Sequence, residues 1–451
     1  MGLVRKAPEL FPSQKESVEF EMERDRVLDF SEPGTGKTRS RLEVFSRRRS
    51  KGAKAMLVIA PKSLLRSAWE IDARRYTPWL KVSVAFATNR VKAFEAKADI
   101  YVTNHDAAKW LAAQKPDFFK KFDYLVVDEG DAFKHSTSQR SRAMNKIKKY
   151  FKFRCLMNGA PNTNTILDVW NQAFIVDDGK RLGTSYFAFR SAVATPEQVG
   201  PKPEMVKWVD REGAEQQVAD LLKDITIRHK LTDVPANRNY VVPFYLKPQQ
   251  LANYLQMERD AVLQLKSGEI SAVNAAAVVT KLLQIASGAV YDGEENYHLI
   301  NTERYEMVMD MVEARKHTLV FFLWKHQRDQ LIAEADKRGL THMLIDGSVR
   351  SDEQRNENVQ MFQAGMYRVG FLHPKSAAHG LTLTKATATI WASPTYDLGW
   401  WVQGKHRIDR RGQTQETENI NVIAQGTLEE KVYERMMVKG GKVKSLLEFF
   451  E

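Results

Sequence analysis

The sequence predicts an α/β fold made of two lobes in tandem, each built on a parallel β-sheet. Short apolar segments of strand type alternate with amphipathic segments of helical type, and this alternation occurs twice along the chain. The chain has 451 residues, which is long enough for two domains of ordinary size. Each lobe is therefore expected to have its own core.

The strands of each lobe are expected where apolar runs stop at a turn. In the first lobe they are predicted to end at Phe30, Ala60, Val102, Val127 and around Met157. In the second lobe they are predicted at 319–322, 343–345, 369–372 and 389–391. Strands at this spacing, with helical stretches between them, favour parallel sheets connected by right-handed crossovers.

A change of pattern marks the boundary between the lobes. Pro235 indicates a connection, so we expect an N-terminal lobe over 1–235 and a C-terminal lobe over 236–451. Between about 180 and 300 the pattern becomes helical and less regular, which predicts helical insertions at about 180–225 and 245–300. Within the second insertion, the Ala/Val/Leu-rich segment from Ser271 to Gln284 is expected to form a buried helix.

Composition limits the class of protein. A single cysteine, Cys155, excludes an internal disulfide and a multi-cysteine zinc module. No apolar run approaches the ~18 residues of a membrane span, and the N-terminus lacks the apolar core of a signal peptide, so we expect a cytoplasmic protein with no membrane partner. The net charge of +12, from 68 basic and 56 acidic residues, favours a polyanion such as nucleic acid; simple solubility is the alternative explanation.

The segment from Ser31 to Thr38 predicts a nucleotide site. Backbone N–H groups curled around Gly34, Thr35 and Gly36, followed by a helix N-terminus, form an anion site for the phosphates of ATP. Lys37 would add a charge for the β- and γ-phosphates, and the Thr38 hydroxyl would hold Mg²⁺. The strict pattern has glycine where this chain has Ser31.

The run from Tyr124 to Glu129 predicts the second part of that site. It is an apolar strand that ends on two carboxylates. Asp128 would hold Mg²⁺, and Glu129 would orient or deprotonate the attacking water. Taken alone, the two carboxylates could simply belong to a turn at the end of a strand.

A third set of candidates lies in the run from Gln403 to Gln413. Arg407 and Arg410 are three residues apart, which would place them on one face of a helix. If that face meets the nucleotide, a guanidinium can stabilise the charge that develops on the γ-phosphate. The alternative is a basic surface helix with solvated arginines.

From about Leu10 to the C-terminus the chain resembles the Snf2-like branch of superfamily 2 DNA translocases and helicases, in particular its small viral or bacterial members. The resemblance rests on segments in family order, which are a glutamine motif at 10–18, motif Ia at 60–65, motif Ib at 102–105, motif III at 158–161, a linker signature at 228–235, the D-G-S motif at 345–348, motif V at 375–383, motif VI at 403–413 and a G-T-I-E-E-K-like segment at 426–431.

The resemblance implies two RecA-like lobes and an enzyme that uses ATP and Mg²⁺. It implies that Lys37, Glu129, Arg407 and Arg410 are catalytic, and that Gln14, Gly380 and Gln403 lie at the nucleotide. It also implies phosphate contacts with a nucleic-acid strand, without reading of bases, by Lys62, Ser63, Asn104, His105, Gly347, Ser348 and Ser376.

The function implied is that of a DNA-dependent ATPase. It would move along double-stranded DNA and remodel forks or junctions, or displace bound protein. One alternative is a helicase that separates strands of DNA or RNA. The other is a nucleic-acid-binding scaffold whose ATPase activity has decayed.

Three departures from the family pattern concern coupling between its parts. The acidic box has Asp131 at its fourth position, where histidine is usual. Motif III has Asn158 and Ala160 where threonines are common, and motif V has Ala378 and His379 in a turn that is normally rich in glycine. We expect ATPase activity to be kept and the coupling to be altered in detail.

Overall fold

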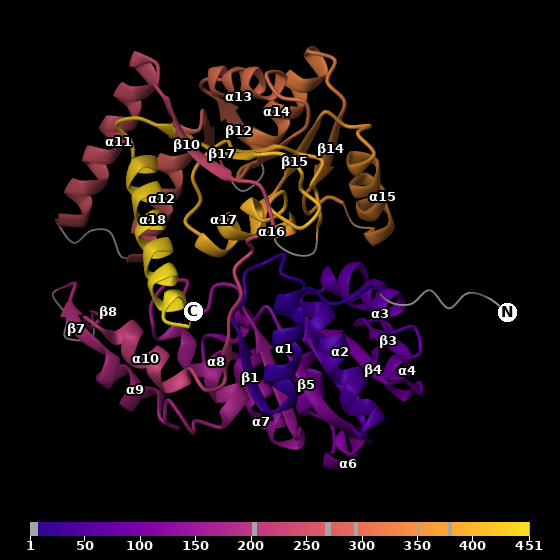
Figure 1. The fold of residues 1–451 in the computed structure, drawn as a ribbon. Coiled ribbons are helices and arrows are strands. Elements are labelled where there is room, and N and C mark those ends of the chain that lie inside the picture. Colours follow the sequence, from indigo (N-terminus) through magenta and orange to yellow (C-terminus); the bar gives the residue numbers. More distant parts are fainter. Residues whose placement is uncertain are drawn as a thin grey trace. The chain divides into compact units, whose positions relative to one another are not determined.

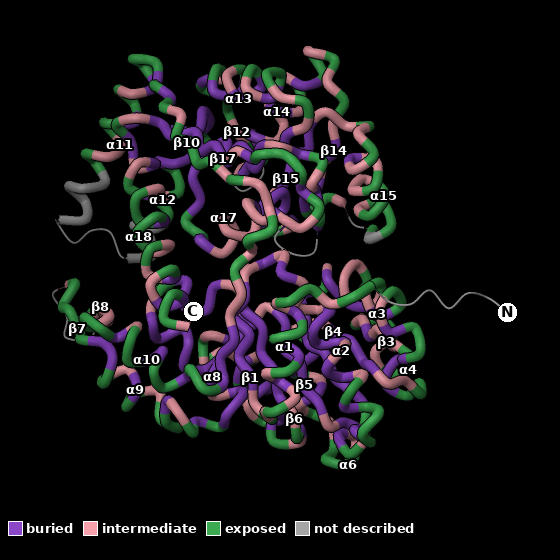
Figure 2. Tube along the Cα trace, viewed as in Figure 1, coloured by how far each residue is buried: buried purple, intermediate pink, exposed green. Residues whose placement is uncertain are grey.

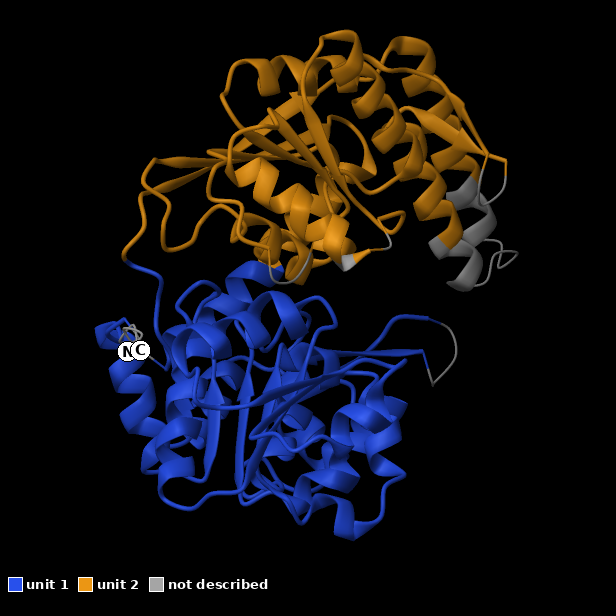
Figure 3. Ribbon diagram, turned by 90° about the vertical axis from the view of Figure 1, so that its right-hand side faces the viewer, with its two compact units in different colours: residues 1–232, 439–451 blue, residues 233–438 orange. Residues whose placement is uncertain are grey.

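The structure, a computed structural model, describes residues 8–200, 205–266, 272–292, 296–349, 351–377 and 381–450. The chain forms two compact units, shown in separate colours in Figure 3: Met1–Thr232 with Lys439–Glu451, and Asp233–Val438. Each unit contains one large parallel sheet, so the predicted pair of α/β lobes is confirmed. The division falls between Thr232 and Asp233, and residues 439–451, expected in the second lobe, group with the first unit.

The sheet of the first unit has seven strands, all of them paired in parallel. Its order is β3 (Val82–Ala85), β4 (Ile100–Asn104), β2 (Ala55–Ala60), β5 (Phe122–Asp128), β6 (Phe153–Met157), β1 (Arg26–Asp29) and β9 (Thr226–Ile227). All six residues of β2 are buried. A continuous apolar run of this kind is typical of a strand that is covered on both faces by helices.

Helices connect these strands (Figure 1). They are α1 (Pro12–Met22), α2 (Lys37–Ser50), α3 (Ile71–Tyr76), α4 (Arg90–Glu95), α5 (Ala107–Ala112), α6 (Pro116–Phe119), α7 (Gln139–Ile147) and α8 (Asp168–Asp177). A π-helical turn precedes α3, and 3₁₀ turns lie at Gly130–Phe133 and Lys148–Tyr150.

The region expected to be helical in the first lobe also contains strands. Between α9 (Tyr186–Val193) and α10 (Ala214–Leu222), the antiparallel strands β7 (Ala194–Gln198) and β8 (Val206–Asp210) form a two-stranded sheet of their own. Only Ala194 of these ten residues is buried. Strands with so little burial carry no clear apolar pattern, which explains why the sequence did not indicate them.

The sheet of the second unit has six parallel strands. Its order is β10 (Asn237–Phe244), β17 (Thr417–Ala424), β16 (Ala388–Trp391), β13 (Thr318–Phe321), β15 (Val369–Leu372) and β14 (His342–Ile345). Leu319 and Phe321 belong to the core on one face of this sheet, whereas Val320 and Phe322 belong to the core on the other. Alternate residues of the strand therefore face opposite cores. Figure 2 shows that the buried residues of both units lie mainly along the strands.

The remaining helices of the second unit surround this sheet. They are α11 (Pro248–Lys266), α12 (Ala272–Ala286), α13 (Glu303–Glu313), α14 (Lys325–Lys337), α15 (Asp352–Gln363), α16 (Pro374–Ala377) and α17 (Leu398–Lys405). The hairpin of β11 (Ala289–Tyr291) and β12 (Tyr297–Leu299) again lies in a region expected to be helical. The helix expected over 271–284 exists as α12; within its residues 277–286, exposed Lys281 lies beside buried Leu282 and Leu283, so this part is not buried throughout.

The C-terminal helix α18 (Leu428–Glu448) starts in the second unit and ends in the first. Near its end, Lys442 Nζ lies 3.0 Å from Asp210 Oδ2, and Lys442 O accepts a hydrogen bond of 3.2 Å from Asn162 Nδ2. The rings of Phe450 and Phe30 are in edge-to-face contact, with their centroids 5.7 Å apart. These contacts explain why residues 439–451 belong to the first unit.

None of the described helices is long and apolar enough to cross a membrane.

Candidate active site

The loop between β1 and α2 has the backbone shape of an anion site. Gly34 and Gly36 have φ angles of 89° and 85°, in the left-handed region that glycine adopts readily. The hydroxyl and the backbone N–H of Thr35 donate to Glu32 O at 2.8 and 3.4 Å, which closes the loop. Gly36 caps α2, whose first turn supplies the backbone N–H groups that bind phosphate in such sites.

The ammonium group of Lys37 is held at this loop. Lys37 Nζ donates to Ser31 O at 2.6 Å and to Glu32 O at 3.2 Å. Thr38 follows in the first turn of α2 and is half-buried. The structure therefore brings together the charge and the hydroxyl that the sequence assigned to the phosphates and to Mg²⁺.

Gln14 lies next to the same loop although it belongs to α1. Its Nε2 donates to Gly36 O at 3.3 Å, and its Oε1 accepts a hydrogen bond from Phe11 N at 3.0 Å. The side chain is buried. Its amide is thus oriented by the backbone on both sides, beside the glycine that caps α2.

Asp128 ends β5 at the carboxyl edge of the sheet. Its Oδ2 accepts a hydrogen bond from Trp69 Nε1 at 2.9 Å, and its Oδ1 accepts one from Glu129 N at 3.0 Å, so the orientation of the carboxylate is fixed. Among the described residues, no group of three or more His, Cys, Asp or Glu could hold a metal. Mg²⁺ in nucleotide sites takes one or two protein oxygens and completes its shell with phosphate and water, and Thr38 with Asp128 fits that donor set.

Glu129 has a strained backbone. Its φ and ψ angles are 52° and 63°, and Asp178 is the only other described non-glycine residue with a positive φ. Gly130 follows in a tight turn, where an added Cβ would lie 2.3 Å from Leu156 Cδ2. The left-handed backbone thus lies at the residue whose carboxylate the sequence assigned to the attacking water.

The motif III segment packs against the phosphate loop. Asn158 N donates to Asp29 O at 3.0 Å, and an added Cβ on Gly159 would lie 2.9 Å from Pro33 Cδ. The Asn158 side chain accepts a hydrogen bond from Ala160 N and donates one to Gln172 Oε1 at 2.7 Å. An asparagine at 158 can therefore stiffen this turn through its own backbone contacts.

Asp131, the unusual fourth residue of the acidic box, reaches the chain that follows motif III. Its Oδ1 accepts a hydrogen bond from Thr163 Oγ1 at 3.1 Å and lies 3.0 Å from Lys134 Nζ. Lys134 Nζ also donates to Thr163 Oγ1 at 2.8 Å. Burial raises the pKa of Asp131, and Lys134 opposes that rise. Asp131 thus links the acidic box to the chain just after motif III, and only the position of Asp131 in the motif pointed to this contact.

A buried cluster of charged residues lies next to the phosphate loop, and the sequence did not predict it. Arg41, on the sheet side of α2, donates to the Glu21 carboxylate and, at 3.2 Å, to Cys155 Sγ, and its Nη2 lies 3.6 Å from Asp29 Oδ2. Burial alone would lower the pKa of Arg41, but Glu21, then Cys155 and Asp29, raise it well above its usual value. Because Asp29 immediately precedes the phosphate loop and its Oδ1 accepts a hydrogen bond from Ser31 N at 3.0 Å, this cluster anchors the start of the loop.

The second unit separates the two arginines that were expected on one helix face. Helix α17 ends at Lys405, so both arginines follow it in an irregular segment and that expectation was wrong. Arg407 is fully buried and donates to Gln403 O at 2.8 Å, to Leu381 O at 3.0 Å and to Gln403 Oε1. Arg410 is half-buried, and its Nε donates to His406 O at 2.7 Å.

The same segment is fastened to the chain around motif V by Gln413. This buried side chain donates to Thr384 O at 3.1 Å and to Ala386 O at 3.0 Å. Arg407 likewise donates to a carbonyl of that stretch, at Leu381. These contacts hold the irregular segment against the chain around motif V.

The candidate nucleic-acid contacts of the first unit follow two neighbouring strands. Lys62, exposed, and Ser63, half-buried, come after β2, and Asn104 and His105 come at the end of β4. Asn104 Oδ1 accepts a hydrogen bond from Arg90 Nη2 at 3.2 Å, and His105 Nε2 lies 2.7 Å from Asp128 O. Parallel strands place their carboxyl ends at one edge, so these four residues share an edge of the sheet with Asp128.

The candidate contacts of the second unit also follow parallel strands. Gly347 and Ser348, both exposed, come after β14, and Ser348 N donates to Asp346 Oδ1 at 2.8 Å. Ser376 lies in the short helix after β15, and its carbonyl accepts a hydrogen bond from Arg355. Gly380, with Ala378 and His379, lies outside the described residues.

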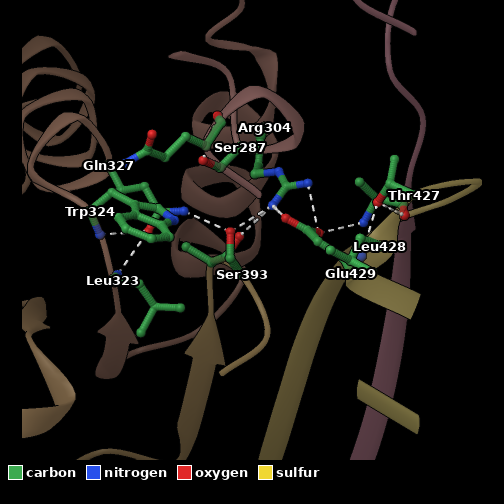
Figure 4. Close-up of polar contacts among 12 residues, drawn as sticks. Ser287, Arg304, Leu323, Trp324, Gln327, Ser393, Thr427, Leu428 and Glu429 are labelled. Atoms are coloured by element: carbon green, nitrogen blue, oxygen red, sulfur yellow. Dashed lines mark hydrogen bonds and ion pairs between the residues drawn. The ribbon is translucent and has the colours of Figure 1, made fainter. Parts of the chain in front are cut away.

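A buried ion pair stabilises the second unit behind these loops (Figure 4). Arg304 of α13 and Glu429 of α18 are each 1 % exposed and form two hydrogen bonds of 2.9 and 3.0 Å. Arg304 Nη1 also donates to Ser393 Oγ at 2.8 Å, and Glu429 Oε2 accepts from Ala424 N at 2.7 Å. Glu429 belongs to the family-like segment at 426–431, whereas its partner lies 125 residues away in the sequence and could not be read from that segment.

Ser393 and Glu429 also line a cavity of about 400 Å³. Aromatic side chains make much of its wall, including Trp324, Tyr396 and Trp400. Trp324 lies three residues after the end of β13 at Phe321, so the cavity lies at the carboxyl edge of this sheet. The polar groups shown in Figure 4 bond to one another, which leaves the cavity mainly apolar.

The sequence of this chain is similar to those of several known proteins. The family model described as the SNF2-related domain matches residues 13–287. Protein p41 of Acyrthosiphon pisum secondary endosymbiont phage 1 is 29 % identical over 439 residues, which cover 92 % of this chain and 93 % of that protein. An uncharacterised ATP-dependent helicase of Mycoplasma genitalium is 24 % identical over 92 % of this chain, but this chain spans only 40 % of its length.

A human relative and a solved structure extend these comparisons. The human SWI/SNF-related matrix-associated actin-dependent regulator of chromatin subfamily A member 1 is 24 % identical over 85 % of this chain, which spans 38 % of that protein. The SWI2/SNF2 ATPase core of Sulfolobus solfataricus in complex with double-stranded DNA is 21 % identical, with a TM-score of 0.46 over 99 % of this chain and 96 % of that one.

Proposed function

Because this chain belongs to the SNF2-related family and is a DNA-dependent ATPase, we propose that it hydrolyses ATP to move along double-stranded DNA. The movement would remodel forks and junctions by branch migration, or displace bound protein. One observation carries the proposal: Gln14, the phosphate loop, Asp128 and Glu129 gather at the carboxyl edge of one parallel sheet, and the unit that follows repeats that architecture.

The residues of the first unit have distinct chemical tasks in this proposal. Lys37 and the backbone N–H groups of the loop bind the phosphates of the substrate ATP. Thr38 and Asp128 would hold Mg²⁺, which neutralises charge on the β- and γ-phosphates when it is bound. Glu129, held in a strained turn, orients the attacking water and accepts its proton.

The second unit would supply the guanidinium that completes the reaction. Arg410 is half-buried, and its guanidinium donates to His406 O at 2.7 Å through Nε and to Thr382 Oγ1 at 3.3 Å through Nη1. Arg407 is enclosed and bonded to backbone carbonyls, so we assign it to positioning the motif VI segment together with Gln403. Of the two arginines first taken as catalytic, Arg410 is thus the one we propose to act on the γ-phosphate.

The residues proposed to bind DNA are of the type that holds phosphates and does not read bases. Lys62 offers a charge, and the hydroxyls and amides of Ser63, Asn104, Ser348 and Ser376 offer hydrogen bonds to phosphate oxygens. A net charge of +12 supports binding to a polyanion. The phage relative, matched over nearly its whole length, supports action in a bacterial or virus-infected cell.

A triplex-displacement assay tests the proposal directly. With ATP, the chain should release a third strand from a long duplex, and Lys37→Ala should release none. The same preparations are then given forked duplexes, and the ATPase rate is measured with single-stranded DNA, duplex, fork, four-way junction and RNA. If strands of the fork separate readily while the triplex stays intact, the protein is a strand-separating helicase and the proposal is wrong.

A further inference from the structure

The phosphate loop is bonded directly to the last stretch of chain in the first unit. The pairing of β1 with β9 continues beyond the strands, because Phe30 N donates to Ile227 O at 2.9 Å and Glu32 N donates to His229 O at 3.0 Å. Residues 228–231 therefore run beside the first residues of the loop. One residue later, at Thr232, the chain leaves the first unit.

Two side chains of the loop strengthen this pairing. Ser31 Oγ accepts a hydrogen bond of 3.0 Å from His229 N, which lies 198 residues away in the sequence. Glu32 Oε2 accepts one of 2.9 Å from Leu231 N, and Glu32 Oε1 lies 3.6 Å from Arg228 Nη2. The Arg228 side chain is 4 % exposed, so this ion pair is partly shielded from water and from salt.

The same two residues also hold the phosphate-binding lysine. Lys37 Nζ donates to the carbonyl oxygens of Ser31 and Glu32. When a triphosphate binds, this ammonium must share its donors with phosphate oxygens, because an ammonium has only three N–H groups. Any resulting change in the Ser31–Glu32 backbone acts on groups that are bonded to 228–231.

Ser31 also accounts for a departure from the nucleotide-binding pattern. Glycine, which the strict pattern has at this position, could not accept the hydrogen bond from His229 N. The serine adds a contact between the loop and the linker signature at no cost in backbone shape, since Ser31 is not among the residues with positive φ.

We propose that Ser31 and Glu32 are positioning residues that couple the phosphate loop to residues 228–231, so that nucleotide bound at the loop changes the order of the chain that leads into the second unit. Coupling of this kind is reciprocal: whatever fixes residues 228–231 alters nucleotide affinity by the same factor. The inference rests on ATP binding at the loop, and not on movement along DNA.

Hydrogen–deuterium exchange of the full chain, without DNA, measures the coupling. We expect the Mg²⁺ complex of a non-hydrolysable ATP analogue to change the exchange rate of amides 228–232 in the parent by about threefold or more. In Ser31→Ala and Glu32→Gln, the change in the logarithm of the exchange rate on nucleotide binding should be less than about half of the change in the parent. Fluorescence titration of the analogue, carried to saturation, ensures that each variant is loaded.

Two further variants separate coupling from general damage. Glu43→Gln removes a carboxylate of similar exposure, 21 % against 28 % for Glu32, from ion pairs with Arg39 and Arg47 on α2, and it should keep the parental response. Ser31→Thr retains the accepting hydroxyl and should restore the response that Ser31→Ala loses. For each variant the exchange rate is compared with and without the nucleotide analogue. A uniform loss of stability would affect both measurements and so would not produce the expected differences.

The proposal is overturned if the parent shows no response at 228–232, or if saturated Ser31→Ala and Glu32→Gln respond as the parent does. Because DNA is absent, either result leaves movement along duplex DNA untouched. Conversely, failure of the triplex assay would not affect the exchange result, so the two proposals fail separately.

Discussion

At the scale of single residues, Arg407 and Arg410 differ more than their spacing suggests. Arg407 is enclosed and donates to two backbone carbonyls, whereas Arg410 is half-buried. A buried guanidinium with this many backbone partners stabilises the fold, and its loss leaves carbonyl groups without donors. We therefore propose that the more exposed arginine is the one that acts on the substrate.

We expect Arg410→Ala to lower the DNA-stimulated kcat by about 10³-fold, the effect typical of an arginine finger, with little change in melting temperature. Arg407→Ala should instead destabilise the second unit by about 1–3 kcal/mol. Steady-state ATPase assays and scanning calorimetry check both, with Arg411→Ala as a control for loss of a neighbouring charge. Parental turnover of folded, nucleotide-binding Arg410→Ala would contradict the assignment.

His326 gives the second unit a pH dependence. It is fully buried at the start of α14, where Ser287 Oγ and Tyr291 Oη lie 3.0 Å from its two ring nitrogens. Burial lowers its pKa from 6.5 to about 4, against a smaller opposite effect of the Ser287 backbone. The folded chain therefore keeps this imidazole neutral where the unfolded chain protonates it.

We expect the second unit to lose about 3 kcal/mol of stability through this residue as the pH falls from 6.5 to about 4, because only the unfolded state takes up the proton in that range. His326→Gln should flatten that part of the pH profile of thermal unfolding. His298→Gln, which changes an exposed histidine, should leave it unchanged. An unaltered profile in His326→Gln would show that this residue does not carry the dependence.

At the scale of elements, the pair of Arg304 and Glu429 joins α13 to the start of α18. Both side chains are buried (Figure 4); Arg304 also donates to Ser393 Oγ, just after β16, and Glu429 also accepts from Ala424 N, at the end of β17. Removal of one member of such a pair leaves an uncompensated buried charge. The next residue, Glu430, is half-buried and bonds only locally, to Gly426 N.

We expect Glu429→Gln to destabilise the second unit by about 3–5 kcal/mol, and Glu430→Gln to change its stability by less than about 0.5 kcal/mol. Calorimetry that resolves separate transitions is the appropriate measurement, because a chain with two units need not unfold in one step. Equal melting temperatures for the two variants would show that the buried pair contributes little.

Most elements could be predicted because their signals are local. The buried strands β2, β5, β15 and β16 appear as apolar runs, and the phosphate loop follows from eight consecutive residues. The hairpins at 194–210 and 289–299 could not be predicted, since they are short and largely exposed. The irregular path around Arg407 was also missed, because it depends on carbonyls near motif V that only the fold brings close.

The candidate site likewise has residues that the sequence could predict and contacts that it could not. Gln14, Lys37, Asp128 and Glu129 were identified from patterns a few residues long, and the structure gathers them at one edge. Their supporting contacts join distant segments, as when Ser31 meets His229, and no single sequence shows which polar residues will meet. Sequence thus indicated the groups that we propose to react, whereas the contacts that hold them became visible only in the fold.

At the scale of the whole molecule, the net charge of +12 makes DNA affinity depend on salt. If six to ten phosphates are contacted, raising NaCl from 50 to 200 mM should weaken binding by about 10³- to 10⁵-fold. We expect Lys62→Ala, measured by fluorescence anisotropy, to reduce the slope of log Kd against log salt by about one.

Lys120→Ala is a suitable control for that measurement. Lys120 is exposed, pairs with Asp117, and precedes the amino end of β5, at the opposite edge of the sheet from Lys62. It should leave the slope unchanged. Equal slopes for both variants would remove Lys62 from the DNA-binding surface.

The environment of Cys155 has a practical consequence. The thiol is 1 % exposed, and burial, followed by the charge of Glu21, raises its pKa well above the usual value. Since the thiolate is the reactive form, maleimides and spin-label reagents should not react with Cys155 at neutral pH. Cysteines introduced on the surface of each unit could then be labelled in the otherwise native chain, and the distance between the dyes followed through the ATP cycle.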